Sequence, residues 1–126
     1  MPKQVLIHNL THTASPALTA EYGESFWRRM RGLMGRSALP DGWGLLMVQG
    51  SESRLDAAIH MFFVPMDLAV IWINTAREVV DVQLARSWRP AYWPKAPAKY
   101  VLETAPERLS SFHIGDRLRF EEIPAV

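Results

Sequence analysis

The longest apolar run of the chain is Ile59-His60-Met61-Phe62-Phe63-Val64-Pro65-Met66-Asp67-Leu68-Ala69-Val70-Ile71-Trp72-Ile73-Asn74. It contains a histidine, a proline and an aspartate, which need partners or a special backbone position in a buried strand. Proline cannot donate a hydrogen bond to a strand ladder, so Pro65 predicts a kink between strands 59–64 and 67–73. We expect this bent strand pair to lie at the centre of a sheet, with Asp67 paired to an arginine.

The composition of the chain is that of one soluble globular domain, residues 1–126. Hydrophobic residues make up 48% and charged residues 21% of its 126 residues, enough apolar side chains for a substantial core. The formal net charge is +1, so the chain lacks the basic excess of a nucleic-acid-binding protein, and we expect no nucleic-acid partner. It has no cysteine, which excludes disulfides and thiolate chemistry.

The start of the chain predicts no export signal. Met1-Pro2-Lys3-Gln4 is followed by no apolar segment typical of a secretory leader. Pro65 and Asp67 interrupt the best candidate for a membrane span. We therefore expect a monomer without a membrane span, cytoplasmic unless a leader was removed.

Short β-rich runs and turn residues alternate along the rest of the chain. The turn at 74–77 makes 67–73 and 78–84 the clearest hairpin, and the polar stretch 50–58 is expected to be a surface loop. Phe26, Met30 and Leu33 follow the helical period, which predicts one amphipathic helix at about 25–34. The eight expected strands are 4–9, 17–22, 43–48, 59–64, 67–73, 78–84, 99–104 and 118–121. The predicted fold class is α+β and β-rich, a small semi-closed, mostly antiparallel barrel or sheet with a single helix.

Several short motifs, in order along the chain, carry a resemblance to a known family. They are Arg31-Gly32-Leu33-Met34-Gly35-Arg36, Gly44-Leu45-Leu46-Met47-Val48, Ile59-His60-Met61, Pro65-Met66-Asp67, Tyr100-Val101-Leu102-Glu103 and Gly115-Asp116. Over about residues 14–121 the chain resembles the DUF192 family, also called UPF0127. The resemblance implies a compact β-rich fold, a small semi-closed barrel with a helix against it. It implies no particular activity.

Arg31, Asp67 and Glu103 are charged residues inside otherwise apolar blocks. A buried carboxylate is costly unless it is paired, so one of the two should meet an arginine. Arg31 could tie the helix to the sheet through Asp67 or Glu103. Alternatively, it could hold an anionic or hydroxylated ligand at the barrel mouth.

His60 is the candidate catalytic residue. With Asp67 or Glu103 as its carboxylate partner it could act as a general base in a small hydrolase-like enzyme. Residues 60 and 67 would face opposite sides of a straight strand, so only the bend at Pro65 could bring them together. No serine has the pattern of an activated nucleophile. A histidine with a purely structural role is the other interpretation.

Histidines and methionines raise the question of copper. His8, His12 and His60 accompany six methionines, and imidazole and thioether ligands suit Cu(I). The methionines at 30, 34 and 47 have core spacing, however, where methionine fills gaps. We expect no metal site and no cofactor.

The segment Trp88-Arg89-Pro90-Ala91-Tyr92-Trp93-Pro94-Lys95 is a rigid loop rich in aromatic residues. Its rings could stack on a sugar, a nucleobase or a partner's prolines, or they could cover the open end of the barrel. We favour a non-enzymatic binding or accessory module for a small polar ligand or a protein partner; the enzyme is the alternative. The expected ligand-binding residues are Arg31, His60, Asp67, Trp88, Tyr92 and Trp93.

Overall fold

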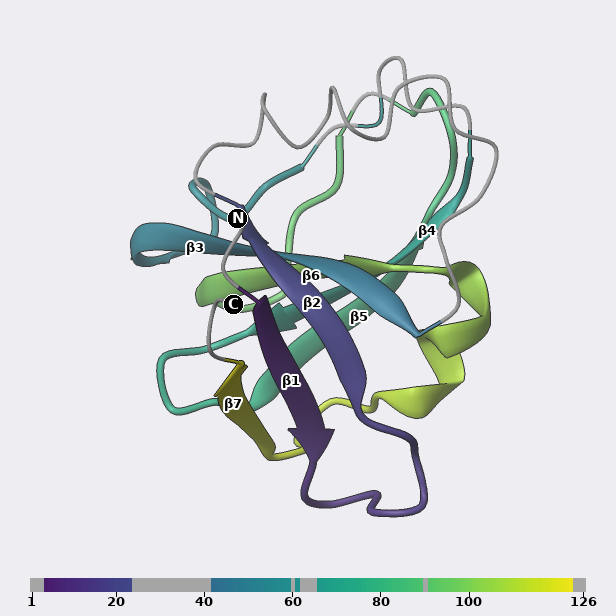
Figure 1. The fold of residues 1–126 in the computed structure, drawn as a ribbon. Coiled ribbons are helices and arrows are strands. Elements are labelled where there is room, and N and C mark those ends of the chain that lie inside the picture. Colours follow the sequence, from purple (N-terminus) through teal and green to yellow (C-terminus); the bar gives the residue numbers. More distant parts are fainter. Residues whose placement is uncertain (1–3, 24–41, 60, 62–65, 90, 124–126) are drawn as a thin grey trace.

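A computed structural model describes residues 4–23, 42–59, 61, 66–89 and 91–123. Over these residues seven strands form one sheet in the order β5-β4-β6-β3-β2-β1-β7 (Figure 1). The strands are β1 (Gln4–Asn9), β2 (Leu18–Gly23), β3 (Trp43–Ser53), β4 (Leu68–Ile73), β5 (Val79–Ala85), β6 (Ala98–Thr104) and β7 (Leu118–Ile123). Among the strands that the structure describes, only β2 and β3 pair in parallel. The β-rich, mostly antiparallel fold class is confirmed.

The hairpin expected from residues 67–73 and 78–84 is present, because β4 pairs with β5 antiparallel. β1 and β2 form a second antiparallel pair. The expectation of a loop from residue 50 onward was wrong for its first part, because β3 continues to Ser53 and pairs there with Ala98. The C-terminal end of β3 is largely exposed, so its side chains are polar and resemble those of a loop. Its backbone nevertheless pairs with β6.

The long apolar run at residues 59–74 contains β4, in which all six residues are buried. β4 lies next to the edge strand β5, so the expected place at the centre of the sheet was wrong. Its residues are apolar on both faces because both faces are covered. In the expected strand 59–64, Ile59 forms an isolated bridge with Tyr92, and residue 61 is not in a strand. Residues 60 and 62–65, with the expected kink, and the expected helix at 25–34 lie outside the described residues.

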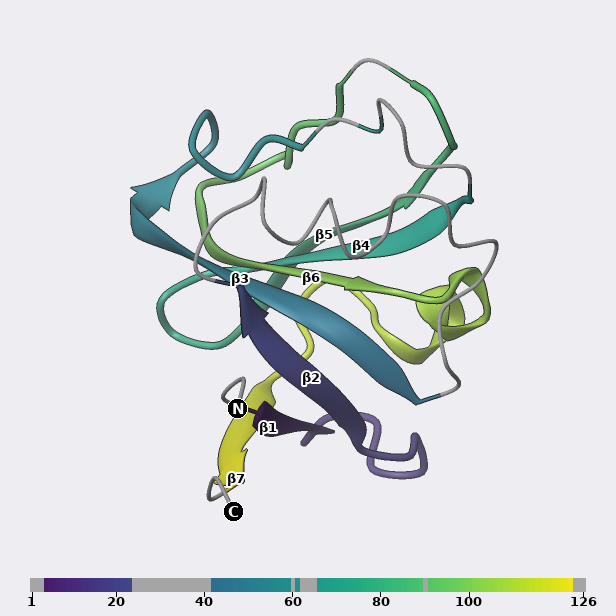
Figure 2. The same cartoon turned by 45° about the horizontal axis from the view of Figure 1, so that its top comes forward.

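Two apolar cores lie on opposite faces of β4 and β6. Leu68, Val70 and Trp72 of β4 belong to the first core, which is covered by loop residues such as Ile59 and Met61. Ala69, Ile71 and Ile73 belong to the second core, together with Val5, Ile7, Leu18 and Ala20 from β1 and β2. The sheet therefore curls, so that its β1–β2 end packs over the second face of β4 and β6 (Figure 2).

The two edge strands approach each other at one end of the sheet. An isolated bridge joins Glu78 to Arg117, and the Val79 amide donates to the Asp116 carbonyl oxygen at 2.9 Å. These contacts do not close the sheet into a barrel, so the fold is an open, curled sheet. A short 3-10 helix, η1 (Pro106–Ser111), begins at a proline, a residue that suits the first position of a helix. No helix among the described residues is long and apolar enough to cross a membrane.

Candidate functional site

The aromatic loop, residues 86–95, leaves the end of β5, and an aspartate anchors its beginning. Asp67 accepts a hydrogen bond from the backbone amide of Ser87 at 2.8 Å and lies 3.5 Å from the Arg86 guanidinium. The sequence predicted that Asp67 would pair with an arginine of the family motif, Arg31, which lies outside the described residues. Among the described residues the arginine beside Asp67 is Arg86. Asp67 therefore fixes the backbone where the loop begins.

A second aspartate, which the sequence did not single out, anchors the other end of the loop. Asp81 of β5 is buried, and its carboxylate accepts hydrogen bonds from the Lys95 amide and the Gln83 side chain. The same Gln83 amide group donates to the carbonyl oxygen of Trp93 at 2.8 Å. A buried carboxylate with several donors is a stable anchor.

Tyr92 turns inward and fastens the middle of the loop. Its ring packs against the first core, and its backbone exchanges two hydrogen bonds with Ile59. Its hydroxyl oxygen accepts the amide of Arg86 at 2.8 Å. Tyr92 is therefore a structural residue of the loop, which leaves the two tryptophans as its outward aromatic groups.

Trp88 and Trp93 are exposed to the extent of 54% and 50% of their surface. Trp88 has a left-handed backbone (φ 65°), which costs a non-glycine residue on the order of 1–2 kcal/mol. Its amide donates to the carbonyl oxygen of Met61, and the Met61 amide donates to that of Arg89. These bonds hold the strained residue in place. Backbone strain that the surroundings maintain is a feature of many functional loops.

Cationic side chains accompany the two tryptophans. Arg86, Arg89 and Lys95 are all exposed. Arginine and lysine next to exposed aromatic rings can bind ligands that combine a flat face with acceptor oxygens. The loop thus has the chemical groups of a binding surface.

Glu103 of β6 lies in the interior of the protein, on the face of the sheet that carries the first core. It is 3% exposed and pairs across the sheet with Leu45 and Val70, both members of the first core. Burial raises the pKa of Glu103 from 4.5 to about 7. Within the described part of the chain, no donor lies within hydrogen-bonding distance of its carboxyl group. Glu103 is therefore a carboxyl group that the fold keeps largely neutral below pH 7.

The structure thus joins some of the predicted site residues and leaves others apart. Asp67 and Tyr92 both contact Arg86, so Asp67 and the aromatic loop form one unit. Glu103 faces the first core, against which Tyr92 also packs, and no hydrogen bond joins it to Asp67 among the described contacts. Arg31 and His60 lie outside the described residues, so their predicted roles in ligand binding or catalysis stay predictions.

A second group of polar side chains lies at the far end of the sheet, where β1 turns into β2 (Figure 1). His12, His113 and Asp116 each offer one possible metal-ligand atom, and these atoms lie within 4.8 Å of one another. Burial by itself raises the pKa of Asp116. Hydrogen bonds from Asn9, the His113 amide and His12 outweigh it and hold that pKa below its ordinary value. The sequence could not reveal this group, because about a hundred residues separate His12 from its two partners.

Comparison with known proteins agrees with the family that the sequence resembles. Residues 8–120 match the DUF192 family, described as "Uncharacterized ACR". A UPF0127 protein of Thermococcus sibiricus is 41% identical over 78% of this chain and 63% of its own length. A UPF0127 protein of Pyrococcus furiosus is 32% identical over 91% of this chain and 97% of its own length. The chain therefore spans less than two thirds of the Thermococcus relative and nearly all of the Pyrococcus one.

Two solved structures share the fold. A protein from Sinorhizobium meliloti 1021, provisionally named a transcription regulator, aligns with a TM-score of 0.79 at 20% identity, covering 95% of this chain and 94% of its own. A protein of unknown function from Novosphingobium aromaticivorans aligns with a TM-score of 0.71 at 20% identity, covering 92% of this chain and 83% of its own. At such low identity the likeness establishes the fold and nothing about activity.

Proposed function

We propose a binding function for this chain, which belongs to the DUF192 family, whose curated relatives are named UPF0127 proteins. In this proposal the chain is a non-enzymatic binding or accessory module. Its ligand lies across the aromatic loop, with Trp88 and Trp93 as the contact faces. The residues Arg31, His60 and Asp67 contribute to the polar side of the same site.

The observation that carries the proposal is the exposure of two tryptophans on a loop with a fixed backbone. Exposing about half of each large apolar side chain to water is unfavourable, and a partner that covers both would recover that free energy. Because Asp67 and Asp81 hold the two ends of the loop, little conformational entropy remains to be lost on binding. Aromatic side chains in such positions are frequent hot spots of binding energy.

The neighbouring cations narrow the class of ligand. Arg86 and Arg89 are exposed and lie within two residues of Trp88 in the sequence, and Lys95 follows two residues after Trp93. The favoured ligand therefore has a flat face or ring for stacking and oxygen acceptors for the cations, as in an acidic oligosaccharide, a nucleotide or an acidic proline-containing peptide. Protein and small-molecule ligands share this chemistry, so the probes must separate them.

The test is a nuclear magnetic resonance titration that follows the indole N–H signals of the uniformly ¹⁵N-labelled chain. The probes are an oligogalacturonate, adenosine monophosphate and a short acidic proline-rich peptide. We expect one class to shift the Trp88 and Trp93 signals, and we expect Trp88→Ala and Trp93→Ala each to weaken binding about fivefold or more.

The matched control is Leu10→Ala, which removes another side chain that is 50% exposed but lies in the turn after β1. It should leave the affinity unchanged. If none of the three probes shifts the loop signals, or if binding survives both tryptophan variants unweakened, the aromatic loop is not the binding surface.

The position of the loop can be tested separately through Asp67. Asp67→Ala removes the acceptor of the Ser87 amide without touching either tryptophan. We expect faster hydrogen exchange at Ser87 and weaker binding of the same probe. Unchanged exchange at Ser87 would mean that Asp67 does not hold the loop.

A small hydrolase-like enzyme is the second candidate, and the raised pKa of Glu103 is the observation in its favour. A carboxyl group with a pKa of about 7 can donate or accept a proton near neutral pH, as a general acid or base must. His60 with Glu103 or Asp67 would supply the catalytic pair. Hydrolysis of a panel of chromogenic esters and glycosides that is lost in both His60→Gln and Glu103→Gln would favour this candidate. Hydrolysis that both variants retain would exclude it.

A further inference from the structure

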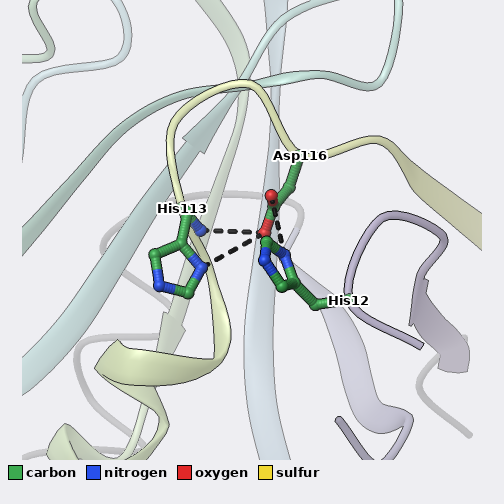
Figure 3. A group of neighbouring side chains, drawn as sticks. All are labelled: His12, His113 and Asp116. Atoms are coloured by element: carbon green, nitrogen blue, oxygen red, sulfur yellow. Dashed lines mark hydrogen bonds and ion pairs between the residues drawn. The ribbon is translucent and has the colours of Figure 1, made fainter. Parts of the chain in front are cut away.

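The three side chains of His12, His113 and Asp116 come from two turns that are distant in sequence. His12 lies in the turn between β1 and β2, and His113 and Asp116 lie in the turn between η1 and β7. In Figure 3 both imidazole rings lie beside the same carboxylate. The group lies at the opposite end of the sheet from the aromatic loop, so a function at one need not depend on the other (Figures 1 and 2).

Asp116 is the fixed member of the group. It is 2% exposed, and its Oδ2 accepts hydrogen bonds from the Asn9 side chain at 2.8 Å and from the His113 amide at 2.9 Å. Its Oδ1 lies 3.0 Å from the Nδ1 of His12. One carboxylate oxygen is thus held by donors of the fold, while the other is directed at an imidazole. Metal-binding carboxylates are commonly oriented in this way by hydrogen bonds to their second oxygen.

Asn9 connects the two turns. Its amide group donates to Asp116 and to the carbonyl oxygen of Ser111, and its Oδ1 accepts the amides of Thr11 and His12. A single buried asparagine therefore sets the position of His12 relative to Asp116. The arrangement is pre-organised before any ligand binds.

The distances suit a single small cation. A Zn²⁺ ion has ligands at about 2.0–2.2 Å, so two ligands of a tetrahedral site lie roughly 3.4 Å apart. The His12 Nδ1 lies 3.0 Å from the Asp116 Oδ1, and one possible ligand atom from each of the three residues lies within 4.8 Å of the other two. Both imidazole side chains are about half exposed (47% and 58%), so small rotations can bring both nitrogens toward one point.

We propose that His12, His113 and Asp116 form a binding site for a divalent transition-metal ion such as Zn²⁺. Two imidazoles and one carboxylate suit zinc and its neighbours in the first transition series rather than Mg²⁺ or Ca²⁺, which prefer oxygen ligands. Three protein ligands at an exposed rim leave at least one coordination position for water or for a partner's side chain. From the sequence we expected no metal site. That expectation considered His12 together with His8 and His60, because nothing in the sequence indicates that His12 lies next to His113.

The first experiment is a calorimetric titration of the untagged, metal-free chain with Zn²⁺, followed by a Co²⁺ titration that reads the ligand set from visible absorption. We expect one equivalent to bind. Removing a residue that hydrogen-bonds a metal ligand lowers metal affinity about 10–100-fold, and removing a ligand itself lowers it at least as much. His12→Ala and His113→Ala should therefore each weaken Zn²⁺ binding at least about tenfold. Both side chains are exposed, so neither change should unfold the chain, which thermal denaturation without metal will check.

The matched control is His8→Ala, which removes another histidine that also contacts a carboxylate, here Glu121 at 2.8 Å. His60→Gln controls for the fourth histidine of the chain. Both variants should bind Zn²⁺ like the unaltered protein. If the unaltered chain binds no equivalent of Zn²⁺, or if His12→Ala and His113→Ala bind it undiminished, the three side chains are only a polar tie between the two turns and the proposal is wrong.

Discussion

Replacing Glu103 with glutamine should stabilise the protein above pH 7, although it alters a residue in the middle of the core. Glu103 is 3% exposed, and its pKa is raised from 4.5 to about 7 by burial. The folded state therefore keeps a proton on this carboxyl group at pH values where the unfolded chain has released it. Glutamine has the same shape and stays neutral at every pH.

The sign and size of the effect follow from proton linkage. Between pH 4.5 and 7 the folded state binds more protons at Glu103 than the unfolded state does, so the free energy of unfolding falls as pH rises. Each pKa unit corresponds to about 1.4 kcal/mol, so ionisation of the buried group costs about 3 kcal/mol once the pH is above 7. Below pH 4.5 this group no longer contributes to the pH dependence.

Urea unfolding of the unaltered protein and of Glu103→Gln at pH 5 and pH 8 measures this effect. At pH 5 the two should agree within about 1 kcal/mol, because Glu103 is neutral in the folded state and pH 5 lies only half a unit above the ordinary pKa of 4.5, so little of the linkage energy has accumulated. At pH 8 the variant should be more stable by about 3 kcal/mol, which moves the urea midpoint by about 1–3 M. The matched control is Glu107→Gln, which removes the same charge at an exposed position of η1 and should change stability by less than about 0.5 kcal/mol at either pH. Parallel behaviour of Glu103→Gln and the unaltered protein at the two pH values would refute the reasoning, since it would mean that a partner compensates the ionised carboxylate in the folded state.

Three further substitutions test the packing and the backbone. Gly44→Ala should lower the free energy of unfolding in urea by about 1–3 kcal/mol, because the added Cβ would lie 2.9 Å from a backbone oxygen. The control is Gly50→Ala on the same strand, whose Cβ meets nothing within 4 Å and which should change the stability by less than about 1 kcal/mol. Equal effects of the two substitutions would contradict this packing. Trp72→Phe removes the indole N–H that donates to the Ala57 carbonyl oxygen at 2.7 Å. We expect the free energy of unfolding, measured by thermal denaturation, to fall by about 1–3 kcal/mol. An unchanged melting temperature would show that this hydrogen bond contributes nothing to stability. Gly115→Ala forces an L side chain into a backbone with φ +95° and should cost about 1–2 kcal/mol in the same assay. An unchanged melting temperature would contradict this strain.

Much of the local structure was predictable because it depends on short-range patterns. The turn at 74–77 lies between two apolar runs, and the two runs form the hairpin of β4 and β5. Turn-forming residues and an alternation of apolar and polar side chains are patterns among residues that are close together in the sequence. The order of strands was not predictable, because the parallel pairing of β2 with β3 and the edge-near place of β4 depend on contacts between distant segments.

The aromatic loop, the candidate binding site, was likewise predictable in part. Its prolines and aromatic residues indicated a rigid loop, but composition could not say which rings would face water. The ladder contact with Ile59 and the hydroxyl contact with Arg86 turn Tyr92 inward, and Trp88 and Trp93 stay about half exposed. The partner of Asp67 could not be chosen either, because Arg86 is no more conspicuous in the sequence than the other arginines.

The sequence by itself determined the β-rich fold class, the family and the local elements, because hydrophobic period and turn chemistry act over a few residues. Only the tertiary structure decided the burial of Glu103, the two aspartate anchors of the aromatic loop and the grouping of His12 with His113 and Asp116. These features arise where segments about fourteen to a hundred residues apart meet. Their geometry is set by the packing of the whole sheet, which no local pattern specifies.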